Sequence, residues 1–72
     1  MAKKLNNIYP GLRAKMSYYD EDAVAISKLL KISPDSARRR LSGRNDFELM
    51  EVFKLIEHYN SSFDELFKVV ER

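Results

Sequence analysis

The chain has 72 residues, of which 44% are hydrophobic and 33% charged, and none is a cysteine. This length accommodates one domain of globular composition; the lack of thiols excludes disulfides and thiolate metal sites, and no apolar run approaches the roughly 20 residues of a membrane span. The net charge of +2 is unevenly divided: residues 1–45 carry ten basic and four acidic side chains, a balance of +6, whereas residues 46–72 carry three and seven, a balance of −4, which favours an anionic partner met in one orientation.

The predicted elements begin after a flexible arm. We expect residues 1–8 to be loose and residues 9–72 to form a single domain. A first helix is predicted over about residues 9–19, because proline is tolerated in a first helical turn and apolar side chains follow at helical spacing. The residues that carry this pattern are Pro10, Leu12, Met16 and Tyr19.

Two short helices joined by a tight turn are predicted next. Asp22 is the expected N-cap of a helix with the sequence AVAISKLL, and Ser33 is the expected N-cap of a helix over about residues 34–42. Lys31 occupies the turn between them, and Gly43 is a C-terminal stop. A turn of about three residues is the spacing of a helix-turn-helix. The predicted inner faces contain Ile26, Leu29, Leu30, Ala37 and Leu41.

Two further helices are predicted after the glycine stop. Apolar spacing assigns the inner face of the fourth helix, which runs to about Tyr59, to Leu49, Val52, Phe53 and Ile56. Met50 and Leu55 lie off this stripe, where they pack on the fifth helix or form a dimer face. Asn60 is a left-handed C-cap, and Ser62 with Glu65 forms a capping box. The inner stripe of the fifth helix is predicted to contain Phe63, Leu66, Phe67 and Val70.

The segment ISKLLKISPDSARRRLSGRNDF resembles the helix-turn-helix of the Cro and phage-repressor superfamily, also called the XRE family. In that family an apolar run ending in two leucines precedes a short turn, a recognition helix and a final small residue with glycine; residues 26–30, 32–33 and 41–43 match these parts. The following FELMEVFKLIEHYNSSFDELF is similar to the family's fourth and fifth helices. The resemblance covers about residues 9–67 and implies an all-α fold of five short helices with a helix-turn-helix of the phage repressor/Cro type.

A narrower resemblance concerns the opening YPGLRAKM, the overall length and the ending. These are similar to the modulators of repression (MOR), small regulators found beside repressors in the lysogeny modules of temperate phages of Gram-positive bacteria. Such proteins work against the lysogenic repressor. The resemblance therefore implies a protein partner as well as, or instead of, operator DNA.

The family resemblance makes the third predicted helix the recognition helix, which lies in the major groove with its N-terminal residues near base edges. An arginine there can hold guanine by two hydrogen bonds, worth about 1–3 kcal/mol of discrimination, whereas Arg40 and Arg44 are better placed for phosphates. Alternatively, Arg40 covers the flank of the domain with its aliphatic stem, because adjacent side chains point around a helix at about 100° steps. The candidate partner- or DNA-binding residues are Val24, Lys28, Asp35, Ser36, Arg38, Arg39, Arg40 and Arg44.

Three positions depart from the family pattern in ways that disfavour direct DNA binding. Ala23 stands where the family has a glutamine that contacts phosphate or braces the recognition helix. Lys31 stands at a left-handed turn position that usually holds glycine, at a cost of roughly 1 kcal/mol. Asp35 can accept a hydrogen bond from cytosine but repels phosphate.

The start of the second predicted helix is apolar where the family typically has Gln-Glu-Glu. Residues 23–25 are Ala-Val-Ala, so Val24 should be largely exposed. A small apolar patch beside an arginine cluster is typical of a protein interface. The alternative is that a single exposed valine has no function.

No catalytic or metal site is predicted. His58 is the only histidine and is expected at the surface, and no set of side chains has the spacing of metal ligands. No nucleophile, base and oxyanion site assemble, so we expect no enzyme and no cofactor. Tyr9, Tyr18 and Tyr19 are expected to be partly buried, with their hydroxyls at the surface.

Two functional hypotheses follow. In the first, the protein is an antirepressor of a phage lytic/lysogenic switch that binds the DNA-binding domain of the lysogenic repressor through its own helix-turn-helix. In the second, it is a Cro-like repressor that reads an operator with the third helix, and a palindromic operator would then require a homodimer. Either protein would act in the host bacterial cytoplasm.

Overall fold

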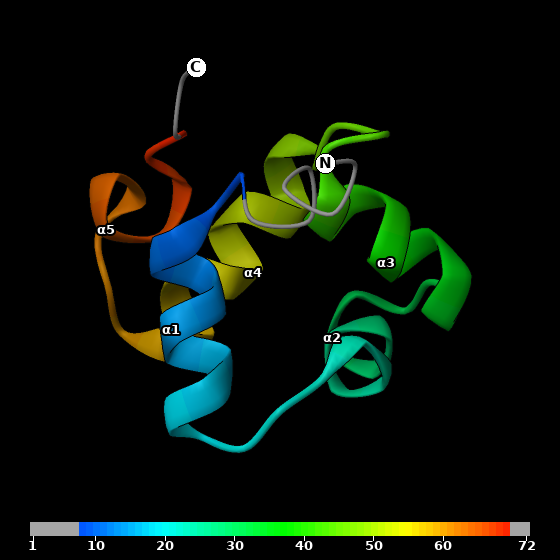
Figure 1. The fold of residues 1–72 in the computed structure, drawn as a ribbon, viewed down its shortest axis with the longest axis horizontal. Helices are drawn as coiled ribbons and strands as arrows, with labels where there is room; N and C mark the ends of the chain where they lie inside the picture. The colour runs from blue at the N-terminus through cyan, green and yellow to red at the C-terminus, as the bar shows by residue number, and fades with distance from the viewer. Residues whose placement is uncertain (1–7, 70–72) are drawn as a thin grey trace, which may run out of the picture.

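The computed structural model of the chain describes residues 8–69, in which five α-helices follow one another without a strand (Figure 1). The predicted all-α class is therefore confirmed. The predicted arm falls almost wholly on residues 1–7, and the predicted inward position of Val70 falls on residues 70–72; both ranges lie outside the described residues. The helices are α1 (Pro10–Tyr18), α2 (Ala23–Leu30), α3 (Pro34–Ser42), α4 (Leu49–Tyr59) and α5 (Phe63–Phe67).

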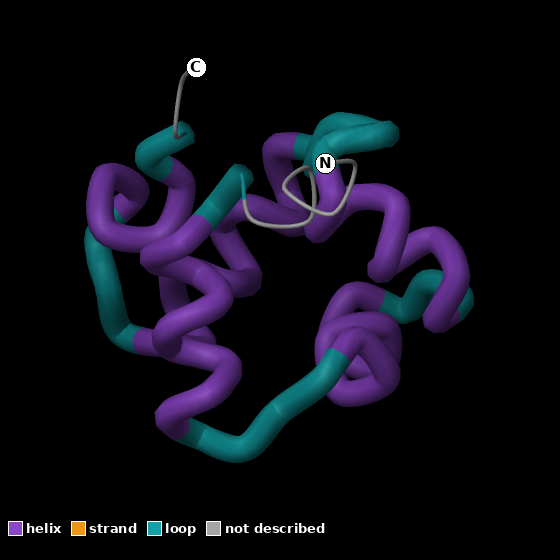
Figure 2. The backbone as a smooth tube through the Cα atoms, viewed as in Figure 1, coloured by secondary structure: helices purple, strands orange, loops and turns teal. Residues whose placement is uncertain are grey.

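The helices form two pairs on either side of α4. α2 packs on α3, α1 packs on α5, and α4 contacts both α2 and α5 (Figure 2). α2 and α3 are joined by residues 31–33 alone, which gives the predicted helix-turn-helix connection. The core lies where the five helices meet and contains Leu12, Met16, Ile26, Leu30, Ala37, Leu41, Val52, Leu55, Tyr59, Leu66 and Phe67.

Local hydrogen bonds define the ends of α2 and α3 as predicted. The Asp22 carboxylate accepts a hydrogen bond from the Ala25 amide at 3.1 Å, and the Ser33 hydroxyl accepts one from the Ser36 amide at 3.0 Å. Lys31 closes α2 in the left-handed conformation, with φ of 61°, which is strained for a residue that has a Cβ. Gly43 closes α3 with φ of 89°, where a side chain would also meet Ile8.

The ends of α4 and α5 are fixed in the same way. Asn60 adopts the predicted left-handed conformation with φ of 51°. The predicted capping box of α5 is present, because the Ser62 hydroxyl accepts from the Glu65 amide at 3.1 Å and the Glu65 carboxylate accepts from the Ser62 amide at 2.9 Å. Gly11 permits the close approach of α1 to α5, since a Cβ there would collide with the backbone carbonyl of Glu65.

The predicted inner face of α4 is correct at Val52, which is buried, and at Ile56, which packs against the core, but it is wrong at the other two positions. Leu49 and Phe53 are 66% and 52% exposed, whereas Leu55, predicted to lie off the inner stripe, is fully buried. The true inner face also contains Glu51, which pairs with Arg40 of α3, and Tyr59, whose hydroxyl donates to Glu21 in the turn before α2. Apolar spacing alone counts such residues as outward-facing, which displaces the predicted stripe.

Three aromatic predictions are corrected as well. Phe63 was assigned to the inner stripe of α5, but it is 55% exposed and stacks on Phe67 with a ring separation of 5.5 Å. Tyr18 and Tyr19 are 80% and 52% exposed and pack against each other at the end of α1. Only Tyr9 is partly buried as predicted, where its ring packs against two phenylalanine rings of the core edge.

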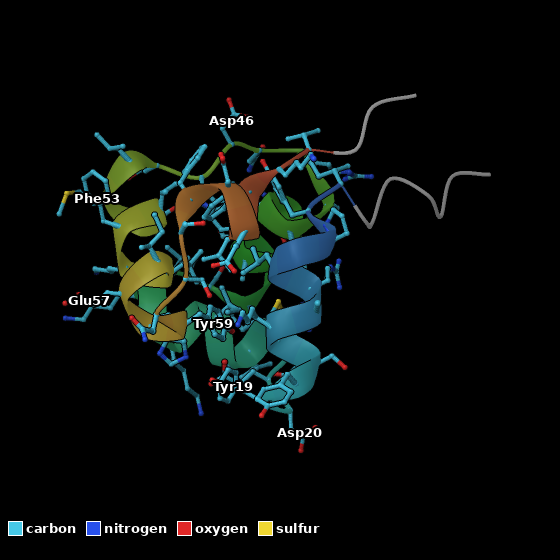
Figure 3. All side chains as sticks on the ribbon, turned by 90° about the vertical axis from the view of Figure 1, so that its left-hand side faces the viewer. Tyr19, Asp20, Asp46, Phe53, Glu57 and Tyr59 are labelled. Carbon is cyan, nitrogen blue, oxygen red and sulfur yellow. The ribbon has the colours of Figure 1, made fainter. Side chains whose placement is uncertain are left out.

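The turn between α1 and α2 is tied to α4 by Glu21. One oxygen of its carboxylate accepts a hydrogen bond from the Tyr59 hydroxyl at 2.6 Å, and both oxygens lie 3.2 Å from Nε2 of His58. His58 is exposed, as predicted. Figure 3 shows Tyr19 close to Tyr59, and their rings are 5.8 Å apart. Burial, together with the hydrogen bond to Glu21 and its negative charge, raises the pKa of the Tyr59 hydroxyl.

Replacing Tyr59 with phenylalanine is expected to lower the free energy of unfolding by about 1–2 kcal/mol at neutral pH, because a hydrogen bond to a charged group is lost. Since the folded pKa lies above the unfolded value of 10.0, the stabilisation is complete below about pH 10 and is lost as the pH rises above it. Urea unfolding at about pH 8 and about pH 11 should therefore show a larger alkaline loss for the wild type than for Tyr59→Phe. Tyr18→Phe, at an exposed tyrosine, is the control; an equal alkaline loss for all three proteins would contradict this role of Tyr59.

Candidate partner-binding face

The predicted site residues lie on α2, on α3 and just after α3. We call this surface the α2–α3 face and define it by the exposed residues Val24, Lys28, Asp35, Arg38, Arg39 and Arg44. Val24 is 37% exposed, so the prediction of a largely exposed side chain holds only in part. Val24 and Lys28 are four residues apart and so share one side of α2.

The structure brings four of these residues together. Asp35, Arg38, Arg39 and Arg44 line a shallow hollow of about 280 Å³ at the exposed side of α3. Val24 and Lys28 do not line this hollow. The arginines of the face thus lie on or just after α3, whereas its apolar residue lies on α2, which packs against α3.

Asp35 and Arg39 form an ion pair within the face. Nη2 of Arg39 lies 2.8 Å from Oδ2 of Asp35, one helical turn away, and both side chains are more than half exposed. An exposed pair of this kind contributes about 0.3–0.5 kcal/mol to stability, so its main effect is on the surface charge. Arg38 and Arg44 form no ion pair with any residue in the range 8–69. Within the described residues, Arg38 and Arg44 are therefore the two arginines of the face whose charge no carboxylate neutralises by direct contact.

Arg40 points in a different direction from its neighbours. Its Nε donates to Oε1 of Glu51 at 2.8 Å, Nη1 donates to the Ser36 carbonyl at 3.4 Å, and the side chain is only 14% exposed. The same Glu51 oxygen accepts from the Glu48 amide at 2.9 Å. Arg40 thus joins α3 to the start of α4, which corresponds to the alternative prediction that it covers the flank of the domain. Ser36 is half-buried, and its amide and hydroxyl are both bonded to Ser33.

Sequence reasoning missed one cationic residue near the face. Arg13 of α1 and Arg38 of α3 line a second hollow, of about 620 Å³. Nε of Arg13 is buried and has no hydrogen-bond partner within residues 8–69. Its position between Leu12 and Met16, which are both buried, was the only signal in the sequence that this arginine lies at the edge of the core.

The described part of the chain contains no group of three or more side chains that could hold a metal ion. No helix within residues 8–69 has both the length and the apolar character needed to cross a membrane. Comparisons of the chain with models of protein families, with curated proteins and with solved structures found no match.

Proposed function

We propose that the protein is a regulator of a phage lytic/lysogenic switch that acts as an antirepressor. In this proposal the α2–α3 face binds the DNA-binding domain of the lysogenic repressor and prevents it from reaching its operator. The protein acts by binding rather than catalysis, without a cofactor, in the cytoplasm of the bacterial host. The sequence resemblance over residues 9–67 supports the class, and the composition of the face supports the mechanism.

One observation carries the proposal: Val24, which is 37% exposed, lies on α2, and α2 packs on the helix whose exposed side pairs one arginine with Asp35. Interfaces between proteins combine an apolar centre with arginine anchors, and they use charges of both signs. A phosphate-binding surface instead gains affinity from each unpaired cation. The mixed charge and the apolar residue therefore fit a protein partner better than a DNA backbone.

A Cro-like repressor that binds an operator directly is the second candidate function. It is favoured by the exposure of Arg38 and Arg39 on a helix that follows a three-residue turn, and of Arg44 just after that helix. Such a helix can enter a major groove, and a palindromic operator would require two copies of the chain. The same basic side of α3 can in principle serve either partner.

The two functions are separated by titrating the protein against operator DNA, with and without purified repressor, at several salt concentrations. The antirepressor proposal expects a stoichiometric complex with the repressor and loss of repressor from the operator. Steeply salt-dependent binding of DNA by this protein alone, with no effect on the repressor, would contradict it and support the Cro-like function.

Val24→Glu is expected to weaken binding to the repressor by about 30-fold or more, because truncating or charging a central interface residue costs about 2 kcal/mol or more. Its effect on any DNA affinity should be much smaller. Isothermal titration with repressor measures the first, and a mobility-shift titration measures the second. Val69→Glu is the matched control, since Val69 is also exposed and lies after α5. Equal weakening by both substitutions would indicate an effect of net charge and not an interface at Val24.

A further inference from the structure

Three large apolar side chains are exposed on the outer side of α4. Leu49, Met50 and Phe53 are 66%, 64% and 52% exposed. Phe53 is four residues from Leu49 and three from Met50, so the three side chains are neighbours on the helix surface. Figure 3 shows Phe53 and Glu57 on one side of α4, where both point away from the other helices. We call Leu49, Met50, Phe53 and Glu57 the outer face of α4.

Packing within the domain does not account for this apolar surface. The opposite side of α4 already supplies Val52, Leu55 and Tyr59 to the core. A single exposed apolar side chain is ordinary, but neighbouring ones form a patch, and such patches mark binding surfaces. The outer face of α4 has no residue in common with the α2–α3 face, so the inference drawn from it goes beyond the proposed function and does not rest on it.

Glu57 gives the outer face of α4 a negative charge at one end. It is exposed and stands in the last turn of the helix, where the helix dipole is negative and disfavours a carboxylate. Neither Glu57 nor Asp46, an exposed acid in the segment before α4, forms an ion pair with any residue between 8 and 69. Lys54 is half-buried and lies about 60° around the helix from Glu57. The complementary surface is therefore apolar in its centre and basic at its ends.

A second copy of the chain does not supply such a surface. Antiparallel pairing of two α4 helices, with Met50 opposite Phe53 of the other copy, directs Glu57 toward Asp46 of that copy, because these two acids lie four residues outside the paired positions. Parallel pairing places the two Glu57 carboxylates side by side. Like charges oppose both dimers, and the same negative charge opposes a nucleic acid.

We propose that the outer face of α4 binds a basic amphipathic helix of another protein. The apolar side chains of that helix cover Leu49, Met50 and Phe53, and one of its lysines or arginines pairs with Glu57. Such a helix presents its apolar residues three and four positions apart, which is the same spacing as on α4. Contact with one short helix buries less area than a standard interface between proteins, so the complex is transient.

The test uses the full chain and a synthetic peptide of about 18 residues, long enough to form a helix, with leucines on one side and lysines along its flanks. One control peptide has glutamate in place of each lysine, and another has the same composition in an order that is not amphipathic. Fluorescence anisotropy measures binding, and ¹H–¹⁵N spectra of the backbone amides locate it. We expect saturable binding of the lysine peptide with amide shifts concentrated on α4, and roughly tenfold or weaker binding of both controls.

Two pairs of variants test the apolar and the charged part of the outer face of α4. Phe53→Ala should weaken binding of the lysine peptide roughly tenfold, because aromatic residues at the centre of an interface dominate affinity. Tyr18→Ala removes an aromatic side chain that is 80% exposed on α1 and should leave binding unchanged. Glu57→Gln should weaken binding about threefold at low salt and reduce its salt dependence. Asp20→Asn removes an exposed carboxylate from the turn after α1 and is its control.

Four results would overturn the proposal. Equal binding of the lysine and glutamate peptides would exclude a basic partner, and equal binding of the non-amphipathic peptide would indicate non-specific adsorption. Absence of saturable binding, or amide shifts confined to helices other than α4, would exclude the outer face of α4 as the site. Self-association of the chain that Phe53→Ala abolishes would assign this face to a second copy instead.

Discussion

Replacing Glu51 with alanine is expected to lower the free energy of unfolding by about 3 kcal/mol. The carboxylate is 9% exposed and accepts hydrogen bonds from both the Arg40 guanidinium and the amide of Glu48, the N-cap of α4. Its removal leaves a nearly buried cation without a partner, and breaking such a pair costs about 3–5 kcal/mol when both groups are fully buried. A domain of this size has a total unfolding free energy of about 4–11 kcal/mol, so the loss is a large fraction of the whole.

Urea denaturation and the thermal midpoint measure this effect, and the Tm should fall by roughly 12–24 °C. Asp35→Asn is the internal comparison, since it breaks the exposed pair with Arg39 on the same helix and should cost less than about 1 kcal/mol. The double variant Arg40→Met, Glu51→Leu should recover much of the stability, because an apolar pair replaces the buried charges. Equal small losses from Glu51→Ala and Asp35→Asn would show that the buried pair has no special structural role.

The second large effect concerns the orientation of α4. Leu55→Ala is expected to cost about 2–5 kcal/mol, because Leu55 is fully buried and its removal leaves a cavity among the helices. Phe53→Ala, which removes a larger side chain that is 52% exposed, should cost far less, roughly 0.5–1 kcal/mol. The predicted inner stripe gives the reverse order, so the pair of variants tests the orientation directly.

Both variants are compared with the wild type by chemical denaturation, and the m-value of each protein is measured. If the m-values agree, the difference in midpoint reports stability alone. A greater loss from Phe53→Ala than from Leu55→Ala would mean that α4 presents its other side to the core. Met50→Ala, at a residue that is 64% exposed, provides a further control on the outer side of the same helix.

The helices and their ends were predictable because their causes are local. Ser33, Gly43 and Asn60 each act on neighbouring backbone groups within one turn, so their roles can be recognised without knowledge of the tertiary fold. The orientation of α4 was not predictable in the same way. It depends on Glu51 meeting Arg40 and Tyr59 meeting Glu21, contacts between residues 11 and 38 positions apart.

The same distinction between local causes and long-range contacts applies to the residues of the candidate site. The exposure of Arg38 and Arg39 follows from the helix-turn-helix pattern and was predicted correctly, whereas Val24, predicted to be largely exposed, is 37% exposed. Arg40 is adjacent to them in sequence, but its ion pair with a residue of α4 is what distinguishes its role from theirs. Arg13 was missed because the burial of its Nε, which has no acceptor among residues 8–69, depends on the packing of α1 and not on a local residue pattern.

The separation of Arg40 from Arg38 and Arg39 has a consequence for how the protein can change. Substitutions at the two exposed arginines remove at most the weak exposed pair of Arg39 with Asp35 and leave the buried interactions intact. Arg40 and Glu51 differ from them, because substituting either residue alone leaves the other without its ion-pair partner and destabilises the fold. Under the proposed function, specificity and foldability are thus encoded by neighbouring residues on different sides of one short helix. New partner preferences would then be introduced at α3 without prior stabilisation of the scaffold.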